Sequence, residues 1–297
     1  TLFRSPEKIF NTPIDLSQQH TPIRIYSAEK IRAKIRTLET VQATYAHHAL
    51  RTLFSYSIKT DPDPIILAEM KKTIGLVDSI SPQEDGWAQQ CGFEAHHIIR
   101  NGPLPIQQPA PEYLAHFADS LESFERSLDV LHQTTINGIR LALPALPSRF
   151  GVDISDATTY QRLITLLSQT PISRIGISFH FASSTIGLPA WLRHVHSLIT
   201  IAADIERLTE KSIVMLDLGG GSTPEDFLIF LQEHLHKLHH TIHTTLPHVQ
   251  HLIFEPGKAL VADCKWFVTS VVERRRGSNG ATILIVDGSV ADIPLVQ

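Results

Sequence analysis

The sequence predicts an α/β fold in which eight parallel strands close into a (β/α)8 barrel. From residue 53 onward, short runs of β-branched and apolar residues alternate with longer segments of helical period, which is typical of repeated βα units. The eight runs span residues 53–58, 76–80, 97–100, 116–118, 137–143, 174–179, 212–218 and 251–254. Helices are expected between them, for example over 61–73, 155–168, 188–209 and 224–241, and several open on a capping residue.

The pattern changes after Glu255, where strand-like runs follow one another without helices between them. These runs span 266–273 and 282–286, and a turn-forming Gly277-Ser278-Asn279-Gly280 joins them. The segment 21–26 is able to supply another strand. We therefore expect an N-terminal segment, 1–30, that contributes to a β-domain, a barrel over 31–262, and a C-terminal β-domain that starts at 263 and looks truncated at 297.

The composition favours a globular protein of the cytoplasm. Hydrophobic residues make up 42% and charged residues 19% of the chain, which suits a buried core. The net charge of −4 is spread over mixed signs, so the basic stripe of a nucleic-acid-binding protein is lacking. No apolar run is long enough to cross a bilayer, and no membrane partner is expected. Only Cys91 and Cys264 are present, which excludes a disulfide framework.

A lysine ends the first predicted strand, in Phe54-Ser-Tyr-Ser-Ile-Lys59-Thr-Asp. The carboxyl ends of barrel strands carry the catalytic groups of barrel enzymes. Partial desolvation at such a position makes an amine nucleophilic enough to form an imine with a carbonyl cofactor. The alternative, an ordinary solvated loop lysine, is the commoner case for a lysine taken alone.

Two further strand ends suggest a phosphate site. Gly219, Gly220 and Gly221 follow the seventh strand and precede a helix, and Glu255-Pro-Gly257-Lys258 follows the eighth. Glycines let backbone amides surround a phosphate, and these two loops form the usual phosphate site of such barrels. A glycine run by itself is often only a flexible turn.

The sixth strand ends in a histidine and two hydroxyl residues, in His180-Phe-Ala-Ser183-Ser184. A histidine alone is more often a packed structural residue than a functional one. The joint arrangement of the lysine, the histidine, the glycine run and the Glu-Pro-Gly sequence at four strand ends favours a functional site.

These motifs resemble those of the fold-type III pyridoxal-phosphate decarboxylases, which act on ornithine, arginine and diaminopimelate. Their usual sequences are Tyr-Ala-Val-Lys-Ala-Asn, His-Val-Gly-Ser, Gly-Gly-Gly and Glu-Pro-Gly-Arg, and the resemblance extends from Thr21 to Leu295. It includes Asp78-Ser-Ile-Ser81 and Arg140. The resemblance implies an alanine-racemase-like barrel, pyridoxal 5'-phosphate (PLP) as the cofactor, no metal, and a homodimer.

The resemblance also implies a role for each site residue. Lys59 would form the Schiff base, His180 would stack on the pyridine ring, and Glu255 would keep the ring nitrogen protonated. Racemases of this class usually have arginine in place of Glu255, so the carboxylate favours decarboxylation. Asp78 and Arg140 would line the cofactor pocket. The phosphate would be held by Gly219, Gly220, Gly221, Gly257, Lys258 and Ser183.

The chain also departs from the family pattern. Lys258 replaces the usual arginine, which keeps the charge but loses bidentate phosphate contact. Ala182 replaces a glycine and Asp61 an asparagine, which is compatible with an unusual substrate. Family members continue past the equivalent of Leu295 with a cysteine that reaches the partner's active site, and neither Cys91 nor Cys264 has that context. We expect the chain as given to lack this proton donor.

The leading hypothesis is a decarboxylase acting on an amino acid or diamino acid derivative, with a siderophore or natural-product pathway as one setting. A non-catalytic PLP-binding protein, an amino-acid racemase and an inactive domain fused to other machinery stay open as alternatives. His236, His240 and His243 have the helical spacing of a metal-binding face, but a polar outer face of a barrel helix explains them more simply.

Overall fold

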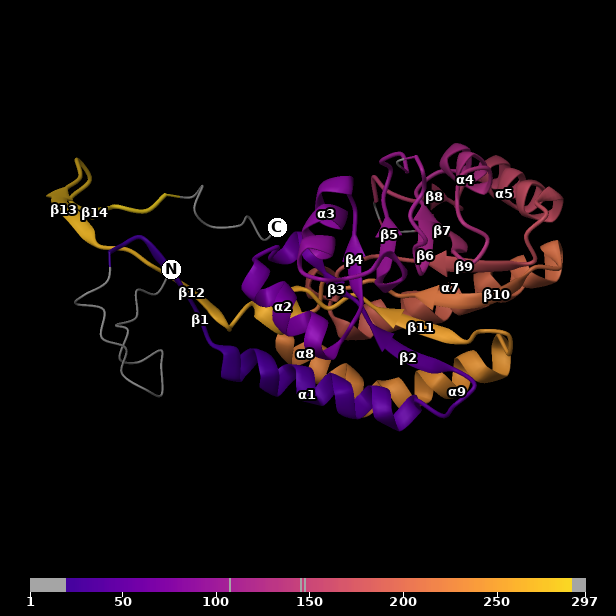
Figure 1. The fold of residues 1–297 in the computed structure, drawn as a ribbon, viewed down its shortest axis with the longest axis horizontal. Coiled ribbons are helices and arrows are strands. Elements are labelled where there is room, and N and C mark those ends of the chain that lie inside the picture. The colour runs from indigo at the N-terminus through magenta and orange to yellow at the C-terminus, as the bar shows by residue number, and fades with distance from the viewer. Residues whose placement is uncertain (1–19, 107, 145, 147, 290–297) are drawn as a thin grey trace. The chain divides into compact units, whose positions relative to one another are not determined.

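The computed structural model describes residues 20–106, 108–144, 146 and 148–289. They fall into two compact units (Figure 1). One unit is Glu29–Ala262, and the other combines the described residues up to Ala28 with those from Asp263 onward. The first unit contains the barrel.

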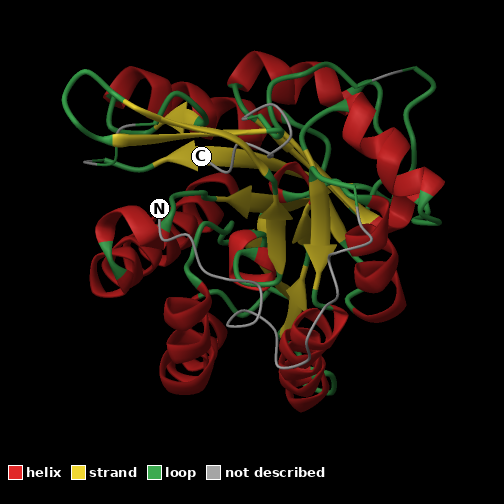
Figure 2. Cartoon of the chain, turned by 90° about the vertical axis from the view of Figure 1, so that its left-hand side faces the viewer, coloured by secondary structure: helices red, strands yellow, loops and turns green. Residues whose placement is uncertain are grey.

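The barrel is a nearly closed sheet of nine parallel strands, with helices outside it (Figure 2). Along the sheet the order is β2-β11-β10-β9-β7-β6-β5-β4-β3, and a short β8 (Val152–Asp153) pairs with β7. The nine strands are β2 (Arg51–Phe54), β3 (Tyr56–Ser57), β4 (Val77–Ser79), β5 (Ile98–Asn101), β6 (Ala115–Ala118), β7 (Ile136–Ala142), β9 (Arg174–Ser178), β10 (Ser212–Asp217) and β11 (His251–Phe254). The predicted parallel barrel is confirmed, and each of the eight predicted runs contains a barrel strand, although the first run contains parts of two.

The first predicted strand, 53–58, is wrong as a single element, because it starts earlier and is broken at Ser55. The part before the break, β2, pairs with β11, and the part after it, β3, pairs with β4. The backbone N–H of Ser55 still donates to the Phe254 carbonyl at 2.8 Å. One short stretch of chain therefore joins the two edges of the sheet and closes the barrel.

Side-chain caps begin five of the described helices. Asp63, Ser81, Ser120, Asp156 and Thr223 each accept a hydrogen bond from a backbone N–H of the first turn. The outer helices are α1 (Ala28–Tyr45), α2 (Pro64–Thr73), α3 (Pro82–Gln90), α4 (Leu121–Leu128), α5 (Ala157–Gln169), α6 (Ser183–Ile186), α7 (Leu188–Thr209), α8 (Pro224–Ile229), α9 (Leu235–Thr245) and α10 (Lys258–Val261). The predicted helix 188–209 is confirmed to the residue. The helix predicted from residue 61 begins at Pro64, because the Asp61 side chain accepts from the Asp63 N–H and forms a turn.

The single helix predicted over 224–241 is interrupted. A π-helical segment, η4 (Phe230–His234), lies between α8 and α9. The Phe230 ring packs against Trp191 of α7 and Phe254 of β11, with centroid separations of 5.4 and 5.1 Å. Since π turns often mark places where a helix adapts to a packing demand, we attribute this one to the seating of Phe230.

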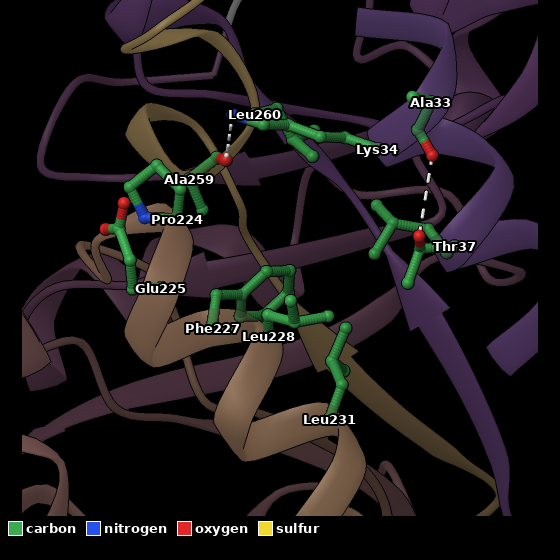
Figure 3. Close-up of a pocket in the computed structure, with 11 residues that line it drawn as sticks. Ala33, Lys34, Thr37, Pro224, Glu225, Phe227, Leu228, Leu231, Ala259 and Leu260 are labelled. Carbon is green, nitrogen blue, oxygen red and sulfur yellow. Dashed lines mark hydrogen bonds between the residues drawn. The ribbon is translucent and has the colours of Figure 1, made fainter. Parts of the chain in front are cut away.

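An apolar groove lies between α1 and the α8–η4 segment (Figure 3). Its volume is about 320 Å³, and Phe227, Leu228 and Leu231 line it opposite Lys34 and Thr37. The Lys34 Nζ donates to the Ala259 carbonyl at 3.1 Å, which ties α1 to α10.

The second unit is made of paired strands. β1 (Ile23–Tyr26) runs antiparallel to β12 (Lys265–Val268), so the strand expected in 21–26 is confirmed. β13 (Val271–Arg276) and β14 (Thr282–Val286) form a hairpin, which turns at Gly277–Gly280 as predicted. The run predicted over 266–273 is wrong as one strand, because it divides at Thr269 and Ser270 between two different partners. The truncation expected at 297 lies outside the described residues.

The polar outer helix face favoured for the three spaced histidines is what the structure has. His236, His240 and His243 are exposed on α9, whereas His239 is buried, bonds Thr52 at 2.5 Å and stacks on Tyr45. Among the residues that the structure describes, no group of three or more His, Cys, Asp or Glu side chains is arranged to hold a metal. No helix in the described part of the chain is long and apolar enough to span a bilayer.

One aromatic ring fills the barrel interior. Phe117 of β6 is fully buried, in a core cluster with Ile99, Met215 and Ile253. The ring lies against two glycines, Gly138 of β7 and Gly176 of β9 (both within the ranges above), because a Cβ at either would overlap it. The missing side chains on two neighbouring strands therefore make the space that Phe117 occupies.

We predict that Gly176→Ala lowers the free energy of unfolding by about 1–3 kcal/mol, because its Cβ would lie 2.8 Å from the Phe117 Cε1. Denaturant unfolding followed by circular dichroism measures the change. The cost should shrink in a Phe117→Leu background, which frees the space. Gly86→Ala is the matched control: nothing lies within 4 Å of the new Cβ, and a helix-interior alanine stabilises. Equal effects of Gly176→Ala in both backgrounds would contradict this packing.

Candidate cofactor site

The polar residues of the candidate site stand one layer above the barrel core. Side chains alternate along a strand, so a residue two positions after an inward-facing one also faces inward. Ile99, Met215 and Ile253 belong to the core cluster, and two positions later come Asn101, Asp217 and Glu255, all buried. Because the strands are parallel, these three groups meet at the carboxyl end of the barrel.

An amide bridges two carboxyl groups in this layer. The Asn101 Nδ2 donates to Asp78 Oδ1 at 2.7 Å and to Glu255 Oε1 at 2.6 Å. Ser57 Oγ donates to the other oxygen of Asp78 at 3.1 Å. Side chains from four separate strand ends are thus locked in one hydrogen-bonded network, which fixes the direction of the Glu255 carboxyl group.

Burial makes this layer hold a proton. The pKa of Glu255 is raised well above its usual value by burial and by the nearby negative charges of Asp217 and Asp78. Burial is also the main cause that raises the pKa of Asp217. The Asp217 Oδ1 accepts from the Gly219 N–H at 2.9 Å, and the Asp217 carboxyl group is hydrogen-bonded to that of Glu255. The layer therefore favours a hydrogen-bond donor or a positive charge placed against it.

His180 stands beside Glu255 and is neutral. Its Nε2 lies 3.8 Å from Glu255 Oε2. Burial, then the charges of Lys59 and Arg140, lower the pKa of His180 well below the usual value. Arg140 donates from Nη2 to the His180 carbonyl at 3.4 Å, and its Nη1 lies 3.9 Å from Asp119 Oδ1. The imidazole thus offers a flat, uncharged face at the mouth of the barrel.

Lys59 is carried by a 3₁₀ turn, η2 (Ile58–Thr60), directly after β3. Its side chain is exposed, yet its charge acts on the pKa values of both Glu255 and His180. Gly257 packs directly against this turn, because a Cβ at Gly257 would overlap the Thr60 Oγ1. This close packing holds the turn in place. The amine is therefore held at the same strand-end surface as the carboxylate and the imidazole.

The two glycine loops pack backbone against backbone. The Glu255 N–H donates to the Gly219 carbonyl at 2.8 Å, and a Cβ on Gly220 would overlap the Glu255 carbonyl oxygen. Gly219 and Gly221 have φ of 65° and 85°, a region that glycine adopts without strain. A Cβ on Gly221 would also lie 2.5 Å from the Ala182 Cβ. Glycine is therefore required at all three positions by space or by conformation.

The backbone amides of these loops differ in availability. The Gly219 N–H is occupied by Asp217, whereas those of Gly220, Gly221 and Gly257 have no hydrogen-bond partner in the described part of the chain. Ser183, the first residue of α6, is buried and donates to Ser222 Oγ at 2.9 Å. Lys258, the first residue of α10, is half-buried. The predicted phosphate residues therefore border one region, but Gly219 contributes through its conformation rather than through its amide.

Two residues of the layer, Asn101 and Asp217, were not predicted from the sequence. Both end a strand, two positions after an apolar residue that faces the core. This spacing was visible in the sequence, but the strand that contains Asn101 was short and its end was predicted one residue too early.

Comparisons with known proteins agree with this arrangement. Residues 140–262 match the family model described as the pyridoxal binding domain of pyridoxal-dependent decarboxylases. That region holds Arg140, His180, the three glycines of the first loop and Glu255. A search of curated proteins returns no match.

Solved structures share the fold at low identity. Lysine decarboxylase from Selenomonas ruminantium is 18% identical with a TM-score of 0.72, and the alignment covers 96% of this chain and 74% of that one. Diaminopimelate decarboxylase from M. jannaschii, in complex with L-lysine, is 16% identical with a TM-score of 0.74, over 92% and 68% of the two chains. Lysine/ornithine decarboxylase from Vibrio vulnificus, complexed with putrescine, is 19% identical with a TM-score of 0.69, over 92% and 73%. All three have the alanine-racemase-like barrel arrangement found here. Residues 140–262 are thus similar to the pyridoxal binding domain of pyridoxal-dependent decarboxylases, and the chain shares the fold of these solved structures.

Proposed function

We propose that this chain is a PLP-dependent amino-acid decarboxylase in which Lys59 binds the cofactor covalently. The observation that carries the proposal is the convergence of an exposed amine, a buried proton-holding carboxyl group and a neutral imidazole at the carboxyl end of one barrel. Lys59, Glu255 and His180 supply these groups. The unpartnered amides of the glycine loops lie beside them.

These residues fit each part of PLP. Three backbone N–H groups without partners, on Gly220, Gly221 and Gly257, suit phosphate oxygens, and Lys258 adds a positive charge. The Glu255 Oε2 is the oxygen that Asn101 does not take, so it suits the N–H of a protonated pyridine ring. Lys59 would hold the cofactor through its amine.

The protein side of the mechanism follows from the layer. When bound, PLP supplies an electron sink for the electron pair left at the α-carbon by loss of carbon dioxide. Glu255 would hold a proton at the ring nitrogen, and Asn101 would keep the carboxyl group pointed there. The negative charges of Asp78 and Asp217 would disfavour loss of that proton. The uncharged imidazole of His180 would stack on one face of the pyridine ring and fix its orientation. Once the substrate amine replaces Lys59, the Lys59 amine would be free to transfer protons.

We infer that the substrate is an amino acid or a diamino acid. The solved relatives are decarboxylases of lysine, ornithine and diaminopimelate, and this supports a test panel of those amino acids together with arginine. Racemisation is the second candidate reaction. Glu255 argues against it, because racemases of this class usually have arginine at the matching position. Release of carbon dioxide, compared with inversion of the α-carbon in deuterated water, separates the two reactions.

Borohydride reduction of the protein incubated with PLP should fix the cofactor on Lys59. Before reduction, the protein should absorb in the visible range, because the protonated imine is conjugated with the ring. Peptide mass spectrometry locates the adduct. Lys59→Ala should abolish the adduct, whereas Lys237→Ala, on the exposed face of α9, should leave it unchanged. An adduct on another lysine in the unaltered protein would sink this assignment.

Glu255→Gln should lower turnover by a hundredfold or more, on the order of the loss seen when one charge-stabilising group is removed from an active site. The amide keeps the shape that Asn101 contacts but cannot hold a proton at a pyridine nitrogen. Circular dichroism and PLP content check that the fold and the cofactor are retained. Glu225→Gln, at the exposed start of α8, is the matched control. Unchanged turnover of Glu255→Gln with cofactor bound would rule out its proposed role.

We further propose that the chain forms a homodimer through its β-hairpin. Among the described residues, β13 and β14 pair only with each other, and a hairpin of two strands is marginally stable alone. Val271, Val272, Ile283 and Leu284 on it are 54%, 62%, 38% and 39% exposed. Exposed apolar side chains beside unpaired strand edges favour association.

Sedimentation should therefore show an assembly that Val272→Glu shifts toward monomer, since the change buries a charge in an apolar contact. Thr282→Glu adds the same charge to the same hairpin at a polar position and should leave the assembly intact. A strictly monomeric protein at all concentrations, or equal effects of the two variants, would argue against a dimer formed here.

A further inference from the structure

A pocket with a basic lining lies at the opposite end of the barrel from the candidate cofactor site. Four neighbouring strands, β2, β11, β10 and β9, begin there with Arg51, His251, Ser212 and Arg174. These four first residues line a pocket with a volume of about 710 Å³. A volume of this size is within the range of small-molecule sites, roughly 300–1,000 Å³.

The two arginines of this pocket lack acidic partners. Neither Arg51 nor Arg174 makes an ion pair with a carboxylate among the described residues, and no Asp or Glu lines the pocket. Arg174 instead donates from Nη2 to the side-chain oxygen of Gln250 at 2.9 Å. Gln250 directly precedes β11, so this bond draws the Arg174 guanidinium across β10 toward His251. Glu206 of α7, which contacts the pocket residue His248 at 3.2 Å, also accepts from the Ile213 N–H at 2.6 Å.

Both arginines act on the pKa of His251. After burial, the charges of Arg51 and Arg174 are the causes that lower the pKa of its imidazole. Its Nδ1 is buried and has no hydrogen-bond partner in the described structure. Two guanidinium groups on different strands thus act on one imidazole, and the residues that line the pocket include no Asp or Glu.

We propose that this pocket binds a small dianion, either a phosphate ester or a dicarboxylate, between Arg51, Arg174 and His251. Guanidinium groups bind the oxygens of phosphate and carboxylate in pairs, which gives strong, charge-assisted hydrogen bonds. An anion there would offset the positive charge that both arginines place around His251. The site is separate from the cofactor cradle, because it lies where the strands begin and the cradle lies where they end.

Isothermal titration of PLP-loaded protein with inorganic phosphate, glycerol phosphate and succinate tests the proposal, since loading fills the phosphate cradle of the cofactor. We expect saturable binding of at least one probe. Arg51→Gln and Arg174→Gln should each weaken that binding about tenfold or more, the loss expected for a hydrogen bond to a charged group. The probe that binds more tightly identifies the phosphate ester or the dicarboxylate as the ligand class. Arg193→Gln, on α7 and bonded only to the Pro189 carbonyl among described residues, is the control and should bind as the unaltered protein does.

Nuclear magnetic resonance of His251 gives a second readout that does not depend on activity. The charged groups around it are Arg51 of β2, Arg174 of β9, His48 before β2, His248 before β11 and Glu206 behind His248. A saturating dianion should raise the pKa of His251, and the rise should be smaller in Arg174→Gln. Absence of saturable binding, equal binding by the arginine variants, or a His251 pKa that the dianion leaves unchanged would each overturn the proposal.

Discussion

The bridge that Asn101 forms between Asp78 and Glu255 is the interaction on which the candidate site depends. It joins groups from β5, β4 and the end of β11, and it turns one oxygen of Glu255 inward while leaving the other at the barrel mouth. Three carboxyl groups share this buried layer, and an unsatisfied buried polar group costs about 1–3 kcal/mol. The shared Asn101 amide, the raised pKa of Glu255 and the nearby charges of Lys59 and Arg140 lower that cost.

The same alternation of side chains builds both the core and the site. Inward positions near the middle of the strands carry Ile99, Met215, Ile253 and the Phe117 ring that two glycines accommodate. The next inward positions carry the polar layer. The apolar core and the polar site thus lie in successive layers of one barrel. The register of the parallel strands that aligns the core residues also aligns the polar residues. The glycine loops above are closely packed for the same reason, because each must approach a neighbouring strand end backbone to backbone.

Much of this arrangement could be predicted from the sequence because it depends on patterns within short stretches of the chain. Alternating apolar runs gave the eight strand positions, and the residues directly after them included Lys59, His180, the glycine run and Glu255. The break at Ser55 could not be predicted, since it arises from closure of the barrel and not from any local preference. The π segment at Phe230 likewise could not be predicted, because it depends on the packing of Phe230 against Trp191 and Phe254. Asn101 was missed because its role lies in contacts with residues 23 and 154 positions away along the chain.

Nitrogen-15 magnetic resonance of the protein loaded with PLP that is labelled at the ring nitrogen tests the central claim most directly. If the buried layer around Glu255 is built to hold a proton at that atom, the ring nitrogen should give the shift of a pyridinium over the whole pH range in which the protein is folded. In Glu255→Gln the shift should become that of an unprotonated pyridine. An unprotonated ring nitrogen in the unaltered protein would contradict the account.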